Sequence, residues 1–238
     1  MILVLWDIDR TLLYVGDTDR LVYKQVFREV VGRDAERLPE RGTGVTMPLA
    51  VRELLSSNGV PDAEVGHLAQ VIVDRLPGCL EQYREEMRLS GRTMPGAEAA
   101  LKAVHQSEEL VPSVLTGNLK ASAEIKLATF SLLKYIDVSV GGFASDSPHR
   151  PALVSIAQQR SASAYGHFFS RRNTVIIGDS LQDVHTGREG GAKVIGVASG
   201  TTSVRQLVEA GADRVISDLM DVDHLKSLIR ELAELEGS

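Results

Sequence analysis

The first 13 residues constrain the fold of this 238-residue chain more than any other stretch. Apolar residues 2–6 run without alternation and stop at Asp7, which is typical of a strand that is buried on both faces and ends in a carboxylate. Asp9 follows two positions later, so both carboxylates leave an extended chain on the same side. Two acids held that close need a cation or a shared proton, unless they only cap a turn.

Composition narrows the class of protein. The net charge is −6 and no run of Lys and Arg occurs, so we expect no basic face for nucleic acid. The single cysteine, Cys79, excludes an internal disulfide and a Cys-based zinc site, and it fits a reducing cytosol. No apolar stretch approaches the roughly 20 residues that span a bilayer. We therefore expect a cytoplasmic protein without a membrane or nucleic-acid partner.

Residues 15–92 have helical patterns and no convincing strand, which indicates a helical unit inserted after the first strand. We expect this unit to form a cap domain, and residues 1–14 and 93–238 to form the core domain. Gly32 is expected to end the first cap helix. The predicted cap helices include residues 21–30, 49–55 and 62–89, the last with a break at Pro77-Gly78.

From Met94 onward, short apolar strands alternate with amphipathic helices. This alternation implies right-handed crossovers, and thus an α/β fold with a mainly parallel sheet and helices on both faces. The predicted strands are 111–115, 137–140, 174–177, 193–197 and 214–216, and the predicted helices are 97–107, 120–133, 151–165, 181–190, 203–210 and 219–235.

Polar residues also follow the strand that is predicted at 111–115. Thr116, Gly117 and Asn118 supply a hydroxyl, and backbone N–H groups at a coming helix start, that could hold a phosphate oxygen. Thr116 could equally be the N-cap of that helix. The sequence therefore indicates a phosphate site here without excluding a plain helix cap.

A second pair of acids, Asp179 and Asp183, follows the strand predicted at 174–177. If a helix begins near Ser180, Asp183 lies one turn into it and can support whatever Asp179 binds. The alternative is that Asp179 caps the helix and Asp183 favours its dipole. With Asp7 and Asp9, Asp179 supplies the hard oxygen ligands that Mg²⁺ prefers.

Three stretches together resemble the motifs of the haloacid dehalogenase superfamily: residues 7–12 resemble its first motif, 115–118 its second and 178–183 its fourth. The resemblance implies a Rossmann-like sheet, Mg²⁺ as cofactor and Thr116 as a phosphate ligand. It also implies that Asp9 ligates Mg²⁺ by its backbone carbonyl alone. A helical insert after the first motif is similar to the cap of the subclass that contains phosphoglycolate phosphatase and β-phosphoglucomutase.

The third motif departs from the family, because Arg150 stands before a proline where the family usually has lysine. Arginine keeps the positive charge and offers a planar fork to phosphate, so we expect Arg150 to take the place of that lysine. Lys120 and Lys126 are other cations, but they belong to the preceding predicted helix.

Residues 41–46 resemble the family's cap loop, which faces the active site and sets specificity. Gly42 and Gly44 would allow a ligand to approach the backbone closely. Arg41 or Thr43 could bind that ligand. The alternative is a simple turn between helices, with Thr46 as an N-cap.

The resemblance implies a hydrolase that cleaves a small phosphate monoester, such as a phosphoglycolate-like acid or a sugar phosphate, through an aspartyl-phosphate. Asp7 would be the nucleophile and Asp9 the general acid and base.

A phosphomutase shares every motif, and an inactive ligand-binding relative is a further alternative. A haloacid dehalogenase would not require Asp9, and a phosphonatase uses a cap lysine and usually lacks the second acid. The sequence allows a monomer or a homodimer.

Overall fold

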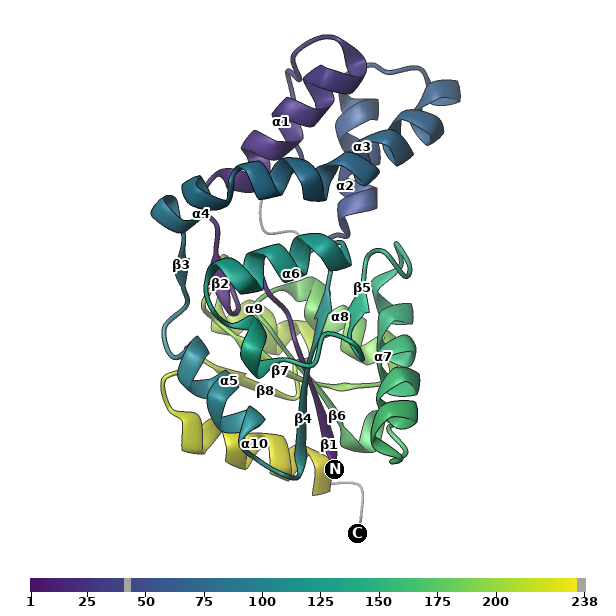
Figure 1. The fold of residues 1–238 in the computed structure, drawn as a ribbon. Helices are drawn as coiled ribbons and strands as arrows, with labels where there is room; N and C mark the ends of the chain where they lie inside the picture. Colours follow the sequence, from purple (N-terminus) through teal and green to yellow (C-terminus); the bar gives the residue numbers. More distant parts are fainter. Residues whose placement is uncertain (41–43, 235–238) are drawn as a thin grey trace.

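The structure is a computed structural model that describes residues 1–40 and 44–234. In these residues a parallel sheet has the strand order β5-β4-β1-β6-β7-β8 (Figure 1). The first strand, β1 (Ile2–Trp6), lies between β4 (Leu110–Thr116) and β6 (Thr174–Gly178) and pairs with both in parallel. The other strands are β5 (Gly142–Phe143), β7 (Lys193–Val197) and β8 (Arg214–Ile216). The predicted α/β fold is therefore confirmed.

Strand β1 is buried on both faces, as its unbroken apolar run predicts. Leu3 and Leu5 face one apolar cluster, which includes side chains of the helices on that side, whereas Val4 and Trp6 face a second cluster. All four side chains have no exposed surface. The first cluster is covered by α7 (Arg150–Tyr165), α8 (Leu181–Gly190) and α9 (Val204–Ala210), and the second by α5 (Ala97–His105), α6 (Lys120–Thr129) and α10 (Val222–Glu234).

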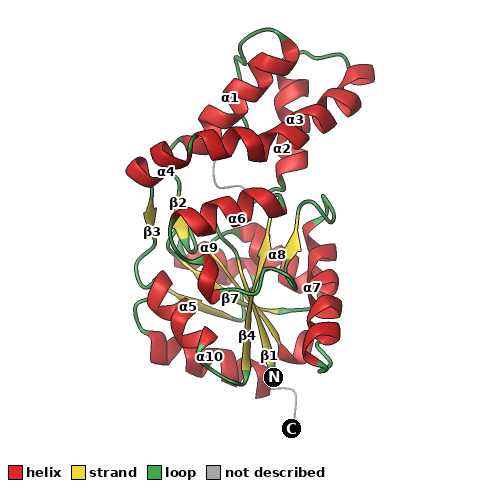
Figure 2. Cartoon of the chain, in the orientation of Figure 1, coloured by secondary structure: helices red, strands yellow, loops and turns green. Residues whose placement is uncertain are grey.

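The inserted helices lie above the core in Figures 1 and 2. They are α1 (Thr18–Val31), α2 (Met47–Ser57), α3 (Asp62–Gln82) and α4 (Arg84–Ser90). Gly32 ends α1 with φ +80°, as predicted. A short antiparallel ribbon of β2 (Leu13–Tyr14) and β3 (Arg92–Thr93) lies where the chain enters and leaves the insert. The guanidinium groups of Arg10 and Arg92 each lie 5.0 Å from the centre of the Tyr14 ring.

The predicted helix break at Pro77-Gly78 is wrong, because α3 continues through Pro77 to Gln82 and the break comes at Tyr83. A proline inside a helix costs about 3 kcal/mol, since it removes a hydrogen bond and clashes with the preceding turn. Leu76 and Leu80 beside it are almost fully buried, and this burial offsets the cost.

The predicted strand at 137–140 is also wrong, since these residues form a turn and the strand is β5. Asp137 accepts hydrogen bonds from the backbone N–H (3.0 Å) and the hydroxyl of Ser139, which favours a turn over a strand. The helix expected at 120–133 ends at Thr129, because Ser131 has φ +59°. The helices expected at 97–107 and 219–235 are α5 and α10, which are shorter at one end or both.

No helix of the described residues combines the length and the apolar character that a membrane crossing requires.

Candidate active site

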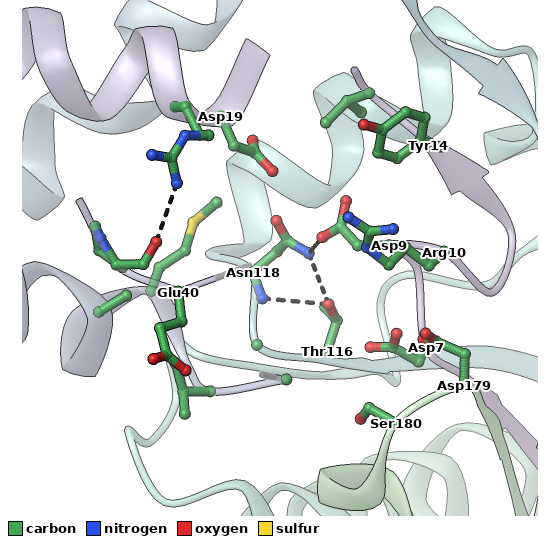
Figure 3. Close-up of a pocket in the computed structure, with 18 of the residues that line it drawn as sticks. Asp7, Asp9, Arg10, Tyr14, Asp19, Glu40, Thr116, Asn118, Asp179 and Ser180 are labelled. Carbon is green, nitrogen blue, oxygen red and sulfur yellow. Dashed lines mark hydrogen bonds between the residues drawn. The ribbon is translucent and has the colours of Figure 1, made fainter. Parts of the chain in front are cut away.

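Asp7 lies directly after β1, at the carboxyl end of the sheet, and its backbone N–H donates to the carbonyl of Ile177 (2.9 Å). The chain then turns tightly, because the N–H groups of Leu12 and Leu13 both donate to the carbonyl of Ile8. Arg10 has φ +66° within this turn. Asp7 and Asp9 line the same pocket, as their spacing predicts, and Figure 3 shows both carboxylates there.

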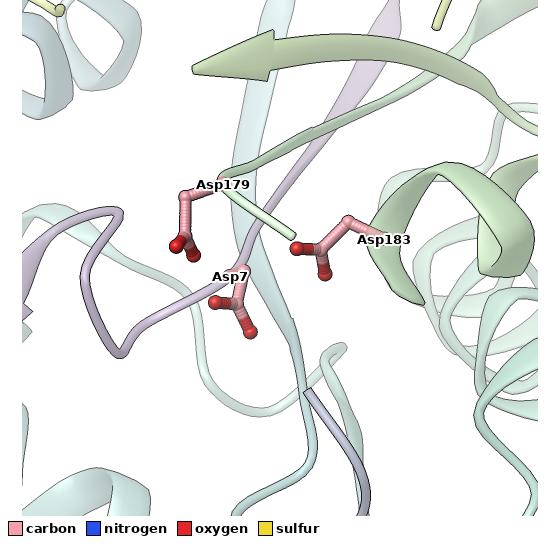
Figure 4. Close-up of side chains that lie close together, drawn as sticks. All are labelled: Asp7, Asp179 and Asp183. Atoms are coloured by element: carbon pink, nitrogen blue, oxygen red, sulfur yellow. The ribbon is translucent and has the colours of Figure 1, made fainter. Parts of the chain in front are cut away.

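Three buried carboxylates meet beside β1. Asp7, Asp179 and Asp183 have oxygen atoms that all lie within 4.8 Å of one another (Figure 4). Ser180 is the N-cap of α8, and its hydroxyl accepts from the N–H of Asp183 while the Asp183 carboxylate accepts from the N–H of Ser180 (2.9 Å). The alternative interpretation, with Asp179 as the cap, is therefore wrong. Because Ser180 caps the helix, the Asp179 carboxylate can bind another partner.

The hydroxyl of Thr11 donates to Asp179 Oδ1 (3.2 Å) and so holds that side chain toward Asp7. Gly200 packs against the same carboxylate, since a Cβ there would lie 1.7 Å from Asp179 Oδ2. The first-motif turn and the loop after β7 thus fix one of the acids that the sequence singled out.

Burial and mutual repulsion disfavour the charged forms of these acids. Burial is the largest cause that raises the pKa of Asp7, and Asp183 adds to it, although Arg150 opposes the shift. Burial and the Asp183 carboxylate raise the pKa of Asp179 to about 7. The cluster therefore has more negative charge than the neighbouring guanidinium of Arg150 compensates.

Arg150 is the first residue of α7 and is buried. Its Nη2 donates to Asp7 Oδ1 (3.2 Å) and to Asp183 Oδ1 (2.5 Å), and its Nη1 donates to the carbonyl of Gly44 (2.5 Å). Burial lowers the pKa of Arg150, but the carboxylates of Asp183 and Asp7 outweigh this cause and raise it. Arg150 thus lies beside the predicted nucleophile and also contacts the cap.

The Thr116-Gly117-Asn118 segment lies at the end of β4, next to Asp9. The Thr116 hydroxyl accepts from the backbone N–H (3.2 Å) and from Nδ2 (2.8 Å) of Asn118. Asn118 Nδ2 also donates to Asp9 Oδ2 at 2.7 Å, as Figure 3 shows. Leu119 is the N-cap of α6, so the interpretation of Thr116 as an N-cap is wrong. Thr116 lines the pocket, and its hydroxyl, which accepts from Asn118, still has its own proton to donate to a ligand.

Gly117 lies against the cap. Its carbonyl accepts from the N–H of Met47 (2.8 Å), and a Cβ on it would lie 2.7 Å from the carbonyl of Val45. A larger residue at position 117 would therefore push the cap loop away from the second motif.

Two further charged residues lie at the site: Lys126, which the sequence analysis set aside because it belongs to the preceding helix, and Asp19, which the sequence analysis did not single out. Lys126 has a fully buried side chain whose Nζ donates to Asp9 and to Asp19, and Asp19 lies in the first turn of α1. A signal was present in the sequence: Lys126 stands three residues after Ala123 and one before Leu127, on the apolar face of the predicted helix. A lone lysine on such a face needs a buried anion.

The predicted specificity residues Arg41, Gly42 and Thr43 lie outside the described residues. The next residue, Gly44, has φ +68° and accepts from Arg150. Thr46 occupies the N-cap position of α2, but its hydroxyl donates to the carbonyl of Pro148 (2.9 Å) and makes no side-chain cap. The cap segment that begins at Gly44 therefore reaches the site.

Cap residues complete the pocket, which has a volume of about 180 Å³. Those with polar side chains are Asp19, Arg20, Tyr23 and Glu40, and Tyr14 of β2 lies beside them. Arg20 also donates to the carbonyl of Pro39 (3.2 Å). The core thus supplies the acids of the pocket floor, and the insert supplies a mixed polar wall opposite them.

A model of the family described as haloacid dehalogenase-like hydrolase matches residues 4–188, which include every motif residue named above. The chain belongs to this family. The family resemblance predicted from the sequence is thereby confirmed, and so is the prediction of a hydrolase. No curated protein matches the chain.

Several solved structures share the fold over nearly the whole chain. A hydrolase from Pseudomonas syringae is 21% identical, with a TM-score of 0.70 over 96% of this chain and 99% of its own. A predicted phosphatase from Clostridium acetobutylicum is 20% identical, with a TM-score of 0.67 over 98% and 99%. A candidate β-phosphoglucomutase from Thermotoga maritima is 18% identical, with a TM-score of 0.59 over 96% and 100%. These likenesses include the inserted helices as well as the sheet.

Proposed function

We propose that this haloacid dehalogenase-like hydrolase cleaves a small phosphate monoester through a covalent phosphate on Asp7. The observation that carries the proposal is the different pairing of two acids that face one pocket. Asp7 contacts the guanidinium of Arg150 among other carboxylates, whereas Asp9 accepts from Asn118 and Lys126. Neighbouring acids with different surroundings suit a nucleophile and a proton-transfer group.

In the first step, an Asp7 oxygen attacks phosphorus, a new P–O bond forms and the bond to the leaving alcohol breaks. The Thr116 hydroxyl, the N–H groups after Asp7 and the Arg150 guanidinium would bind the phosphoryl oxygens. Arg150 already donates to Asp7 and so would hold the carboxylate for attack. This contact supports the proposal that Arg150 takes the place of the usual lysine.

Asp9 would give its proton to the leaving oxygen in the first step. In the second step it would take a proton from the water that attacks phosphorus, which releases inorganic phosphate and frees Asp7. The Asp9 side chain lies outside the acid cluster of Asp7, Asp179 and Asp183. This separation supports a proton-transfer role, because the Asp9 carboxyl group faces the pocket apart from the acids that would hold the cofactor.

Mg²⁺ is the proposed cofactor, and the donor set fits it. Hard carboxylate oxygens gather in a buried site, where burial and, after it, the neighbouring carboxylates raise the pKa values of Asp7 and Asp179. A divalent cation would favour the charged forms of these acids. The side chains of Asp7 and Asp179 would hold the ion, with the Asp9 backbone carbonyl as the family resemblance implies. Asp183, already bonded to Ser180 and Arg150, would support them. When bound, Mg²⁺ would reduce the repulsion between the negative charges of the phosphate and of the Asp7 carboxylate.

The pocket suits a small leaving group, since its volume is about 180 Å³. Arg20 and Tyr23 offer donors to an acid or a hydroxyl, and Glu40 offers an acceptor. A phosphorylated two- or three-carbon acid or a sugar phosphate fits this lining. The cap would close over it and exclude bulk water.

Phosphate release from a panel of small esters tests the proposal. The panel would include phosphoglycolate, sugar phosphates and nucleoside monophosphates, each with Mg²⁺, with EDTA and with the Asp7→Asn variant. We expect release that requires both Mg²⁺ and Asp7. Release that persists with EDTA or in Asp7→Asn would contradict the proposed mechanism.

A phosphomutase is the second candidate, because two solved structures with the same whole-chain fold carry the description β-phosphoglucomutase. A mutase would keep the phosphate on an isomerised product, whereas a phosphatase would free it. Product analysis of each sugar phosphate by NMR separates the two.

A further inference from the structure

A buried ammonium group joins Asp9 to the cap. The Lys126 side chain on α6 has no exposed surface. Its Nζ donates to both oxygens of Asp9 (2.8 and 3.0 Å) and to Asp19 Oδ2 (2.8 Å). Asp9 belongs to the core turn after β1, whereas Asp19 belongs to the cap helix α1. A continuous set of ion pairs therefore links core and cap.

The two acids reach Lys126 from the side of the pocket. Their side chains are 37% exposed for Asp9 and 31% exposed for Asp19, and both line the pocket that Lys126 does not line. Lys126 thus holds each carboxylate from behind, and part of each carboxylate faces the space that a substrate would fill. A substrate would meet Asp9 and Asp19 and not the lysine itself.

Burial lowers the pKa of Lys126, but the carboxylates of Asp19 and Asp9 outweigh burial and raise it, so the ammonium keeps its charge. Asn118 holds Asp9 from another direction, since its Nδ2 donates to Asp9 Oδ2 (2.7 Å) and also to the Thr116 hydroxyl (2.8 Å). With donors on both oxygens, the Asp9 carboxylate has one orientation relative to the phosphate-binding segment.

We propose that Lys126 is a positioning residue for Asp9, and that Asp19 ties this position to the cap helix α1. The inference rests on the proposed function, because it assumes that Asp9 transfers the proton to the leaving group. Arg150 contacts Asp7, and Lys126 contacts Asp9, so each acid has its own cation. Loss of Lys126 should therefore harm proton transfer to the alcohol more than attack by Asp7.

Leaving-group dependence tests this role. An alkyl ester such as phosphoglycolate needs a proton on its leaving oxygen, whereas p-nitrophenyl phosphate has a leaving group that departs without one. We expect Lys126→Met to lower kcat/KM for the alkyl ester about 100-fold and for p-nitrophenyl phosphate less than about 10-fold. A loss of folded protein would lower both values equally, so the ratio of the two isolates the positioning role.

Lys126→Met leaves Asp19 without its cation, which can prevent folding. The double variant Asp19→Asn/Lys126→Met removes both charges of this ion pair, which destabilises the fold less than leaving Asp19 without its cation. If the single variant does not fold, the ratio of the two kcat/KM values in the double variant tests the positioning role. Lys134→Met is the matched control, because Lys134 is an exposed lysine outside the pocket, and we expect its ratio to equal that of the wild type.

Phosphate release by the wild-type enzyme with Mg²⁺ distinguishes a failure of the Lys126 role from a failure of the proposed function. If the wild type releases no phosphate from any ester, the proposed function fails and the Lys126 role fails with it. If the wild type is active and the ratio is unchanged in a folded Lys126 variant, only the positioning role is overturned. The positioning role is supported if the ratio of kcat/KM for the alkyl ester to kcat/KM for p-nitrophenyl phosphate falls in the Lys126 variant and not in Lys134→Met.

Discussion

Asp7 and Asp9 are two residues apart and face one pocket, yet their surroundings differ in kind. Asp7 is buried among other carboxylates, and Arg150 donates to it and to Asp183. Asp9 is partly exposed, and its carboxylate accepts from Lys126 and Asn118. One acid therefore lies in excess negative charge and the other lies against donors.

This difference has a physical origin in the tight turn after β1. Asp7, at the end of β1, lies beside the acids that follow β6 and begin α8, whereas the turn, with Arg10 at φ +66°, places Asp9 against α6. Chemically identical side chains thereby acquire different partners. The comparison teaches that neighbouring carboxylates can have separate roles when the backbone sends them to different elements.

Removing the nucleophile should have the largest effect. We expect Asp7→Asn to lower phosphate release by roughly 10⁴-fold or more, because the amide cannot form the covalent intermediate. Steady-state assays with the best ester of the panel measure this loss, and circular dichroism checks that the fold is retained. Substantial turnover by folded Asp7→Asn would contradict the assignment of Asp7 as nucleophile and Asp9 as proton-transfer group.

Asp9→Asn should lose less, about 10²- to 10⁴-fold, because it removes proton transfer and leaves the nucleophile. With p-nitrophenyl phosphate, attack by Asp7 can still proceed, so we expect phosphorylated protein to accumulate since no base activates water. Intact-protein mass spectrometry after rapid quenching detects the added phosphate. Full activity with an alkyl ester would exclude the acid–base role.

Variants of Arg150 test how much its positive charge beside Asp7 contributes to activity. We expect Arg150→Lys to retain more activity than Arg150→Met, because lysine restores the charge although it lacks the planar fork. A loss of about 100-fold or more in Arg150→Met, at equal folded fraction, would agree with its contact to Asp7. Equal activities in the two variants would show that the charge does not matter.

The smallest expected effect concerns stability. Asp179 has its pKa raised from the usual 3.8 to about 7 by burial and Asp183, so the folded state binds more protons than the unfolded state between these values. Without Mg²⁺, the free energy of unfolding should therefore fall as pH rises from 4 to 7. Mg²⁺ at about 100 times its Kd should raise Tm by about 5 to 10 °C at pH 7.5 and by less at pH 5.

Thermal melts at both pH values, with Mg²⁺ and with EDTA, measure this effect. Asp179→Asn is the matched control, because it removes one carboxylate from the cluster and should reduce both the pH dependence and the response to Mg²⁺. A Tm that is independent of Mg²⁺ at pH 7.5 would argue against a metal in the acid cluster.

The sequence by itself determined five of the six strands of the parallel sheet, the motif residues and the place of the helical insert. A short unbroken apolar run that stops at polar residues is typical of a strand covered on both faces, and Leu3 to Trp6 are covered in that way. The spacing of Ser180 and Asp183 likewise determined the start of α8 through local hydrogen bonds. These features depend on residues close in the chain, where periodicity and capping rules apply.

Tertiary structure decided the rest, because it depends on contacts between distant residues. The helix through Pro77 persists since packing offsets its local cost, and the turn at Asp137 replaces a strand. Lys126 meets Asp9 across 117 positions of sequence, and Arg150 meets Asp7 across 143. No local rule reports which acid a distant cation will reach, so only the folded chain assigns each carboxylate its partner.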